Sequence, residues 1–242
     1  MVMTIKSNVP SNIIANPDGW NPPFATDGLL YAGIYGRGNL AKNFAPGGVD
    51  AVVTGAPVVN NHFATFDFNN FIETGVQVTK ETTLIAIFKR INPTKRQFFI
   101  SAYRGSTDAG RSLALDPGNP NIAIYSHYKD TATDVSSVQF AATKLDITDG
   151  SPAFMYGRDT GKKLNIWNMT SQKGSGITLP GTIESFVNPA LTYQIGRSNS
   201  REVPEPASMG AALIFNRALS DGEIAAIYAY FQGYFARRGI SI

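Results

Sequence analysis

The side chains that could carry out hydrolysis are scattered along this sequence. Glycoside hydrolysis needs two carboxyl groups flanking the scissile bond, but the glutamates are spread over positions 73, 81, 184, 202, 205 and 223. No G-x-S-x-G segment supplies a nucleophilic serine, and neither His62 nor His127 has a recognisable serine or acidic partner. We therefore interpret both histidines as ordinary surface or strand residues and predict that the protein is not an enzyme.

Three groups of aromatic and polar residues could instead bind a sugar. An exposed aromatic ring can stack on a sugar, while planar polar or charged groups bond its hydroxyls. The candidates are Tyr103 with Arg104, then Tyr125 with His127 and Tyr128, and finally Trp167 with Asn168. The alternative for each ring is packing in the core or on a sheet surface, which is the commoner environment of a large aromatic side chain on a strand.

Nothing in the sequence specifies a metal or a cofactor. Cysteine is absent, which excludes a disulfide and a thiolate metal site. No dense D-x-D-x-D-G loop occurs, and the isolated residues Asp67, Asp108, Asp116 and Asp159 are typical of turns. We expect no cofactor, with a Ca²⁺ site built from distant loops and backbone carbonyls as the open alternative.

The charge and the apolar runs argue against nucleic acid and membrane partners. The net charge is +3 and the basic residues are dispersed. No apolar run approaches the ~20 residues of a bilayer-spanning helix, and the first ten residues lack the apolar stretch of a secretory signal. Charged residues make up 16% of the chain, below the usual quarter, as is typical of extracellular or virion β-proteins.

Short apolar and alternating segments, separated by turn residues, predict the elements that must hold these side chains. Such spacing favours an all-β sandwich of two antiparallel sheets over a βαβ fold. The predicted strands are 63–68, 83–89, 97–103, 112–115, 121–125, 154–156, 164–169, 192–195 and 211–215. Residues 84–88 are apolar on both faces, which predicts a central strand that is covered on both sides.

Only the end of the chain has helical periodicity. Ser220 and Glu223 have the spacing of a capping box, and an apolar stripe follows at helical spacing. Arg237 and Arg238 lie where cations favour the negative end of a helix, and Gly239 suits the left-handed position after it. We predict one helix over 220–238.

The first 26 residues contain four prolines among Asn, Ser and Gly, which predicts an extended arm ahead of one domain over 27–242. The arm is either a flexible lead-in or a strap on a partner subunit. Trp20 is difficult to bury within its own domain on this interpretation. We therefore expect it to contact a neighbouring subunit, in a homo-oligomer.

Residues 214–224, Ile-Phe-Asn-Arg-Ala-Leu-Ser-Asp-Gly-Glu-Ile, resemble the closing "fNRaLsdaEI" segment of laminin-G-like, concanavalin A-like domains. Residues 66–73, 161–167 and 194–198 are similar to further family segments, so the resemblance covers roughly residues 29–238. It implies a two-sheet jelly roll, a fold that does not fix function. The family's usual "YvNG" turn is here Trp-Asn-Met-Thr at 167–170, so no ligand role carries over to that loop.

Within this superfamily, the tail at 230–240 looks most like small virion or prophage proteins of tailed bacteriophages. That resemblance implies a virion-associated lectin-like module of a tail, fibre or capsid surface, contacting host glycans or other virion subunits. The alternative is a purely structural capsid decoration or baseplate protein without a glycan site. A divergent hydrolase or lyase is a third reading, but the E-x-D-x-x-E strand of glycosidases on this fold is absent.

Overall fold

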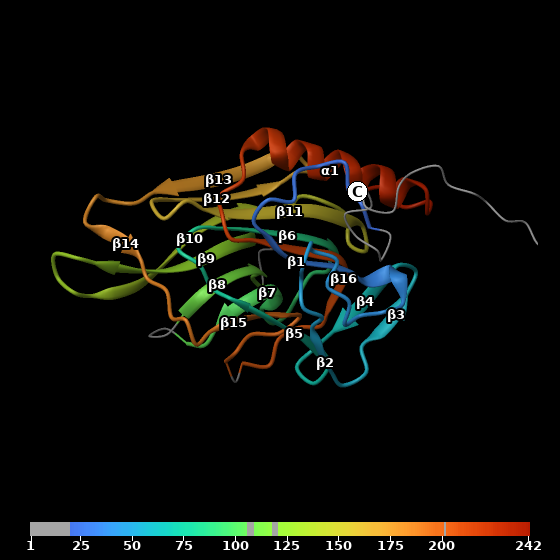
Figure 1. Cartoon of the computed structure of the whole chain (residues 1–242), viewed down its shortest axis with the longest axis horizontal. Coiled ribbons are helices and arrows are strands. Elements are labelled where there is room, and N and C mark those ends of the chain that lie inside the picture. The colour runs from blue at the N-terminus through green and yellow to red at the C-terminus, as the bar shows by residue number, and fades with distance from the viewer. Residues whose placement is uncertain (1–19, 106–108, 118–120, 201) are drawn as a thin grey trace, which may run out of the picture.

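The protein consists of two antiparallel β-sheets with one α-helix lying on the outer face of one of them (Figure 1). The structure is a computed structural model, and it describes residues 20–105, 109–117, 121–200 and 202–242. This architecture confirms the predicted two-sheet jelly-roll sandwich with a C-terminal helix.

Sheet A carries the helix and has the strand order β13-β12-β11-β6-β16-β4-β3, with β1 also paired to β16. Its strands are β1 (Leu29–Ile34), β3 (Val58–Asn60), β4 (Phe63–Phe66), β6 (Thr82–Lys89), β11 (Pro152–Asp159), β12 (Lys163–Asn168), β13 (Lys173–Thr178) and β16 (Ala207–Phe215). A short 3-10 helix, η2 (Tyr35–Arg37), follows β1.

Sheet B has the order β10-β9-β8-β7-β15-β5-β2, with β14 also paired to β9. Its strands are β2 (Val52–Thr54), β5 (Phe71–Gln77), β7 (Gln97–Tyr103), β8 (Ala109–Leu115), β9 (Asn121–Asp130), β10 (Ser136–Lys144), β14 (Ile183–Ser185) and β15 (Thr192–Ile195). Each predicted strand coincides with or overlaps one of these elements, whereas β1, β2, β3, β5, β10, β13 and β14 were not predicted.

The central strand β6 explains how the core is built. Leu84, Ala86 and Phe88 point into the core between the two sheets, while Ile85 and Ile87 belong to a second apolar cluster between sheet A and the helix. All five side chains are fully buried. The prediction of a strand covered on both sides is therefore confirmed.

The helix α1 (Asp221–Ala236) is slightly shorter than predicted, because its flanking residues act as caps. The Glu223 amide donates to Ser220 Oγ at 3.3 Å, and the Ser220 amide donates to a Glu223 carboxylate oxygen at 2.8 Å, which is the expected capping box. Gly239 has a φ of 71°, as its position after a helix requires. Ile224, Ile227, Phe231, Tyr234 and Phe235 are the buried face of the helix.

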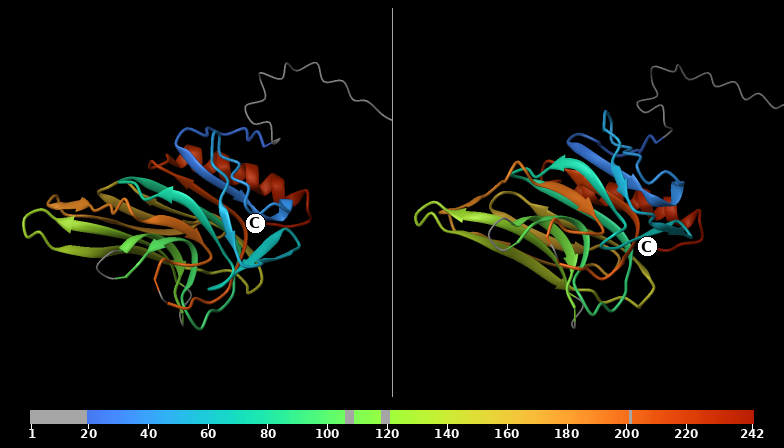
Figure 2. Two further views of the ribbon diagram at one scale, coloured as in Figure 1. Left: turned by 60° about the horizontal axis from the view of Figure 1, so that its bottom comes forward. Right: turned by 90° about the horizontal axis from the view of Figure 1, so that it is seen from below.

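Residues 20–26, the described part of the predicted arm, lie beside α1 (blue and red in Figures 1 and 2). Trp20 is only 3% exposed within its own chain. Its ring packs edge-on against Phe24, at 6.0 Å, and Tyr230, at 6.4 Å, and its Nε1 donates to the Tyr230 hydroxyl at 2.9 Å. The prediction that Trp20 is difficult to bury in its own domain is wrong, because α1 supplies the surface that covers it. Residues 1–19 of the arm lie outside the described residues.

Candidate functional site

The predicted sugar-binding residues fall on two different sheets and therefore do not form one site. Tyr103 ends β7, and Tyr125, His127 and Tyr128 lie on β9, so these belong to sheet B. Trp167 and Asn168 lie on β12 of sheet A. Arg104 follows β7 and is exposed. The sandwich separates the two groups, and only the sheet B group can share a surface.

Tyr103 and Tyr125 both lie on the outer face of sheet B, away from sheet A. A continuous row of planar side chains joins them, which we call the aromatic row: Tyr103, Phe98, Arg96, Tyr125 and Phe140. The rings of Tyr103 and Phe98 are stacked at 6.2 Å. The Arg96 guanidinium carbon lies 6.0 Å from the Phe98 ring centre and 5.2 Å from that of Tyr125. The rings of Tyr125 and Phe140, directly paired across β9 and β10, are 5.7 Å apart.

The row becomes more exposed toward β10. Phe98 is buried, Tyr103 and Tyr125 are half-buried, and Phe140 is 55% exposed. The exposed part of the Phe140 ring is apolar surface in contact with water, which a ligand can cover. Arg96 and Phe140 were missed at the sequence level. Residues 136–144 alternate too weakly to mark a strand, and Arg96 lies among dispersed basic residues that indicate no site.

Asp116 fixes the centre of the aromatic row. One of its carboxylate oxygens accepts from Arg96 Nε at 2.8 Å, and the other accepts from the Tyr125 hydroxyl at 2.5 Å. Burial raises the pKa of the Tyr125 phenol, and the bond to Asp116 raises it further. The phenol therefore stays protonated and keeps donating, so the ring and the guanidinium hold their places without a ligand.

Three of the predicted ligand-binding residues are buried, and the structure corrects their assignment. Tyr128 points between the sheets and donates to Asp159 at 2.6 Å. His127 is 1% exposed and packs edge-on against Phe186, at 5.0 Å. Asn168 is buried and accepts from the Ser171 amide at 3.2 Å. None of these side chains can contact a ligand, because strand alternation and the loops over them remove them from the surface.

Tyr128 belongs to a buried polar network centred on an ion pair. Arg111 and Asp159 are both fully buried, with Nε of Arg111 2.9 Å from Asp159 Oδ2. Asp159 also accepts from Ser126 Oγ at 2.6 Å and from the Gly161 amide at 2.7 Å. Asp159 is therefore a turn residue, as expected, and at the same time the counter-ion of a buried arginine. The network ties β8 and β9 to the end of β11 and is part of the framework.

Trp167 packs on the outer face of sheet A, on the same side as α1. It pairs across the sheet with Gly174, where any Cβ would overlap its indole ring. The glycine thus makes room for the ring on the sheet. Trp167 is half-buried at this position and lies on the opposite side of the sandwich from the aromatic row.

The structure offers no metal centre among the residues that it describes. No group of three or more His, Asp or Glu side chains there is arranged to hold an ion. Asp67 instead accepts from the amides of Asn69 and Asn70, and Asp116 serves the aromatic row. Within the described residues, no helix has the length and apolarity needed to cross a membrane.

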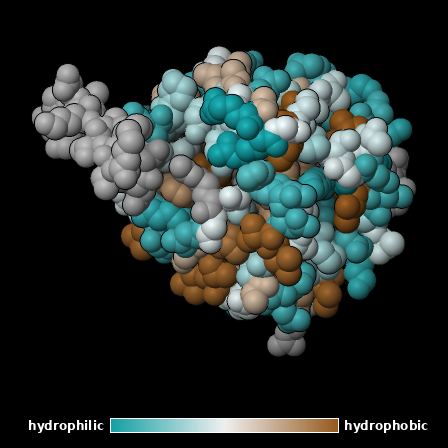
Figure 3. Space-filling model, turned by 90° about the vertical axis from the view of Figure 1, so that its right-hand side faces the viewer, coloured by the Kyte–Doolittle hydropathy of each residue, from teal (hydrophilic) through white to brown (hydrophobic). Residues whose placement is uncertain are grey.

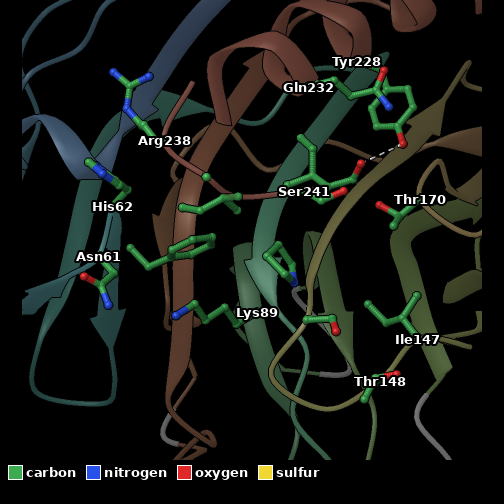
Figure 4. Close-up of a pocket in the computed structure, with 16 residues that line it drawn as sticks. Asn61, His62, Lys89, Ile147, Thr148, Thr170, Tyr228, Gln232, Arg238 and Ser241 are labelled. Atoms are coloured by element: carbon green, nitrogen blue, oxygen red, sulfur yellow. Dashed lines mark hydrogen bonds between the residues drawn. The ribbon is translucent and has the colours of Figure 1, made fainter. Parts of the chain in front are cut away.

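A groove of about 1030 Å³ lies at the end of α1, between the segment that follows the helix, the β3–β4 turn and the loop before β11 (Figure 4). Lys89, at the end of β6, lies on its floor. None of the predicted sugar-binding residues lines it. Sequence patterns did not indicate this groove, because its walls come from five separate segments of the chain.

No protein-family model matches this sequence, and a search of curated proteins finds no similar sequence. Solved structures with the same fold include the binding domain of botulinum neurotoxin serotype D/C VPI 5993, with a TM-score of 0.61 and 12% identity over 86% of this chain. The binding domain of serotype D (TM-score 0.60, 11% identity, 84% of this chain) and that of neurotoxin DC in complex with SialylT (0.60, 11%, 86%) are similar to the same degree.

The chain spans about half the length of these binding domains, 53%, 52% and 52% respectively. At this level of identity the similarity shows the fold alone, a lectin-like β-sandwich.

Proposed function

We propose that this protein is a non-enzymatic carbohydrate-binding module and that the aromatic row is its saccharide site. The observation that carries the proposal is the exposed ring of Phe140 beside the fixed ring of Tyr125. Two adjacent rings on a sheet face offer stacking surface to a sugar, and the polar edge around Arg96 and Asp116 offers partners for hydroxyl groups.

Two further facts support a binding role. The similar solved structures are receptor-binding domains, and one of them is in complex with SialylT. Both carboxylates that the structure places beside the aromatic row are engaged with it: Asp116 bonds Arg96 and Tyr125, and Glu202 lies 3.8 Å from Arg96. Carboxylates that hold a guanidinium and a phenol in place suit a binding site better than an acid and base pair for hydrolysis.

A glycan array probed with the whole chain tests this proposal, followed by calorimetry on the glycans that bind. Phe140→Ala is expected to weaken binding about tenfold, since ring stacking contributes about 0.5–1.5 kcal/mol beyond buried area. Val135→Ala is the matched control, because Val135 is also an exposed apolar residue, at 60%, in the turn between β9 and β10. Binding that both variants retain in full, or release of sugar from a bound glycan, contradicts the proposal.

We further propose that the module is carried on the virion of a tailed phage. The support is the resemblance of the chain's last segments to small virion proteins. Labelled antibody against the whole chain, viewed on purified particles by electron microscopy, should decorate a tail, fibre or capsid surface. Particles that never carry the label would contradict this location.

A specific observation favours a structural role as the second candidate. Val49, Val52, Val58 and Val59 are 82%, 62%, 68% and 43% exposed. Three of them lie on β2 and β3, which are the edge strands of sheets B and A on the same side of the sandwich. Figure 3 looks onto this side and shows apolar surface there. Free strand edges and exposed apolar patches are both sites of subunit contact.

Sedimentation velocity distinguishes this candidate from the first. If the chain associates through the edge, Val58→Lys with Val52→Lys should give monomers while glycan binding stays unchanged. A wild-type chain that is monomeric at high concentration and binds glycans leaves the structural role without support.

A further inference from the structure

We propose that the groove at the end of α1 is a second, separate binding site, for a carboxylate-bearing sugar, with Lys89 as the partner of the carboxylate. This inference does not depend on the aromatic row, which lies on the outer face of the other sheet. It rests on the charge of the groove, on the position of Lys89, and on the backbone of the β3–β4 turn.

The groove is polar and cationic. Lys89, His62 and Arg238 line it from three different elements, and none of the described side chains there is acidic. The terminal carboxyl group of Ile242 also lies in the groove, where Ile242 O accepts from the Tyr228 hydroxyl at 3.2 Å. Thr148 and Thr170 lie across the groove from His62 (Figure 4), and Ser151 also lines it. A groove that is lined by an ammonium group and by several hydroxyls matches a ligand that carries one carboxylate among many hydroxyl groups.

Nearby acids do not neutralise Lys89. In the loop before β11, Asp146 is paired with Lys173, at 2.5 Å, and Asp149 with Arg90. The ammonium of Lys89 lies 4.8 Å from the centre of the Phe63 ring and has no carboxylate partner among the described residues. A half-buried cation that faces an aromatic ring and no anion is positioned for an anionic ligand.

The β3–β4 turn gives an independent indication. Asn61 and His62 form its two central residues, with φ values of 46° and 69°. This left-handed pair is the geometry of a type I′ hairpin, in which the second position is normally glycine. Asparagine and histidine are among the non-glycine residues that adopt this conformation most often, although each costs free energy there relative to glycine. The turn thus places His62 among the residues that line the groove, where its imidazole can act as a second donor to the ligand (Figure 4).

The turn is also held from behind. A Cβ on Gly36 would come within 2.7 Å of the His62 Cα, so the backbone of the turn packs directly on the backbone of η2. Strained residues persist where the surroundings fix them, and such places are frequently ligand sites. His62 is therefore presented to the groove by a rigid support.

Methyl glucuronoside and methyl glucoside are suitable probes, because they differ only in a carboxylate against a hydroxymethyl group. NMR titration of the labelled whole chain should show the glucuronoside shifting amides around Lys89 and His62, with the glucoside binding about ten- to a hundredfold more weakly. Lys89→Gln should weaken glucuronoside binding to the level of the glucoside. Lys89→Arg should restore most of the affinity, and Lys163→Gln, an exposed lysine outside the groove, should change nothing.

His62→Gly separates a ligand role from a structural one. Glycine relieves the strained backbone, so the melting temperature should rise by about 2–4 °C, while glucuronoside binding falls several-fold. Equal binding of the two sugars, unchanged binding by Lys89→Gln, or a loss of both stability and binding in His62→Gly would overturn the proposal. Shifts confined to Tyr125 and Phe140 would also overturn it, while leaving the aromatic row as the sugar site.

Discussion

The outer faces of the two sheets carry similar side chains but have opposite environments. On sheet A, Phe154, Tyr156 and Trp167 lie on the outer face and belong to the apolar cluster formed with α1. On sheet B, the aromatic row lies on the outer face, where no α-helix among the described residues covers it. Aromatic side chains on the outer face are thus buried in a core on sheet A and lie at the surface on sheet B.

This difference shows that aromatic residues on a strand acquire their role from what the rest of the chain places over them. Phe154 packs against Phe231 and Tyr228 of α1, with ring centres 6.4 and 5.1 Å apart. Phe140 packs against Tyr125, and more than half of it is exposed. A covered ring stabilises the fold, whereas an uncovered ring remains available to a ligand.

The largest expected effect is on the covered face. Phe231→Ala should lower the free energy of unfolding by about 3–5 kcal/mol, because the side chain is fully buried between α1 and sheet A and its removal leaves a cavity. Urea unfolding followed by circular dichroism measures this loss. A loss below about 1 kcal/mol would mean that α1 is a marginal cover and that the two faces differ less than the structure implies.

A smaller effect follows from the close approach of α1 to the sheet. A Cβ on Gly210, in β16, would lie 2.7 Å from Phe235 and 3.1 Å from Phe63, two buried rings. Gly210→Ala should therefore cost about 1–3 kcal/mol through overpacking. Gly222→Ala is the control in the same denaturation experiment, since nothing lies within 4 Å of a Cβ at that position.

The cap of α1 gives a pH-dependent effect of about 1 kcal/mol. Hydrogen bonds from Arg217, then from Ser220, lower the pKa of Glu223 from 4.5 to about 2. Because the folded pKa is depressed, this stabilisation is complete above about pH 4.5 and is lost as the pH falls through 2. Glu223→Gln should destabilise at neutral pH, and its difference from wild type should shrink toward pH 2. A difference independent of pH would contradict the role of the carboxylate charge.

The smallest effect on stability is expected on the uncovered face. Phe140→Ser should change the free energy of unfolding by less than about 0.5 kcal/mol, because more than half of the ring is already in water. The same variant should weaken glycan binding about tenfold, as Phe140→Ala does, because both remove the ring. A large destabilisation by Phe140→Ser would show that this ring serves the fold, and it would remove the contrast with sheet A.

Local patterns in the sequence were sufficient for several elements. Helix α1 was predicted because its cap, its apolar stripe and the glycine after it are each a pattern of residues close together in the chain. Strand β6 was predicted because its consecutive residues 84–88 are all apolar. Alternation along β9 already places Tyr125 and Tyr128 on opposite faces, so the burial of Tyr128 was predictable from their odd spacing.

The unpredicted strands lack such a local pattern, and β13 is an example. β13 contains Gly174 and Gly176, which form strands poorly, yet Gly174 is required because the Trp167 indole occupies the space of a Cβ.

The predicted strand β7 has a bulge between Phe98 and Ile100, which changes the alternation of its side chains between the two faces of the sheet. Phe98 and Tyr103 therefore share a face despite their odd spacing, which simple alternation would not predict.

Local sequence patterns were sufficient to predict the two-sheet class of the fold, its closing helix and the presence of aromatic candidates on strands, because each depends on residues that are near neighbours in the chain. Which of those candidates are accessible depends on how distant segments pack together. Burial of Trp20 required α1, more than two hundred residues later. The aromatic row required the register of three strands, and the groove required five segments to converge. Contacts between distant parts of a chain leave no local pattern, so the site could be read only from the folded molecule.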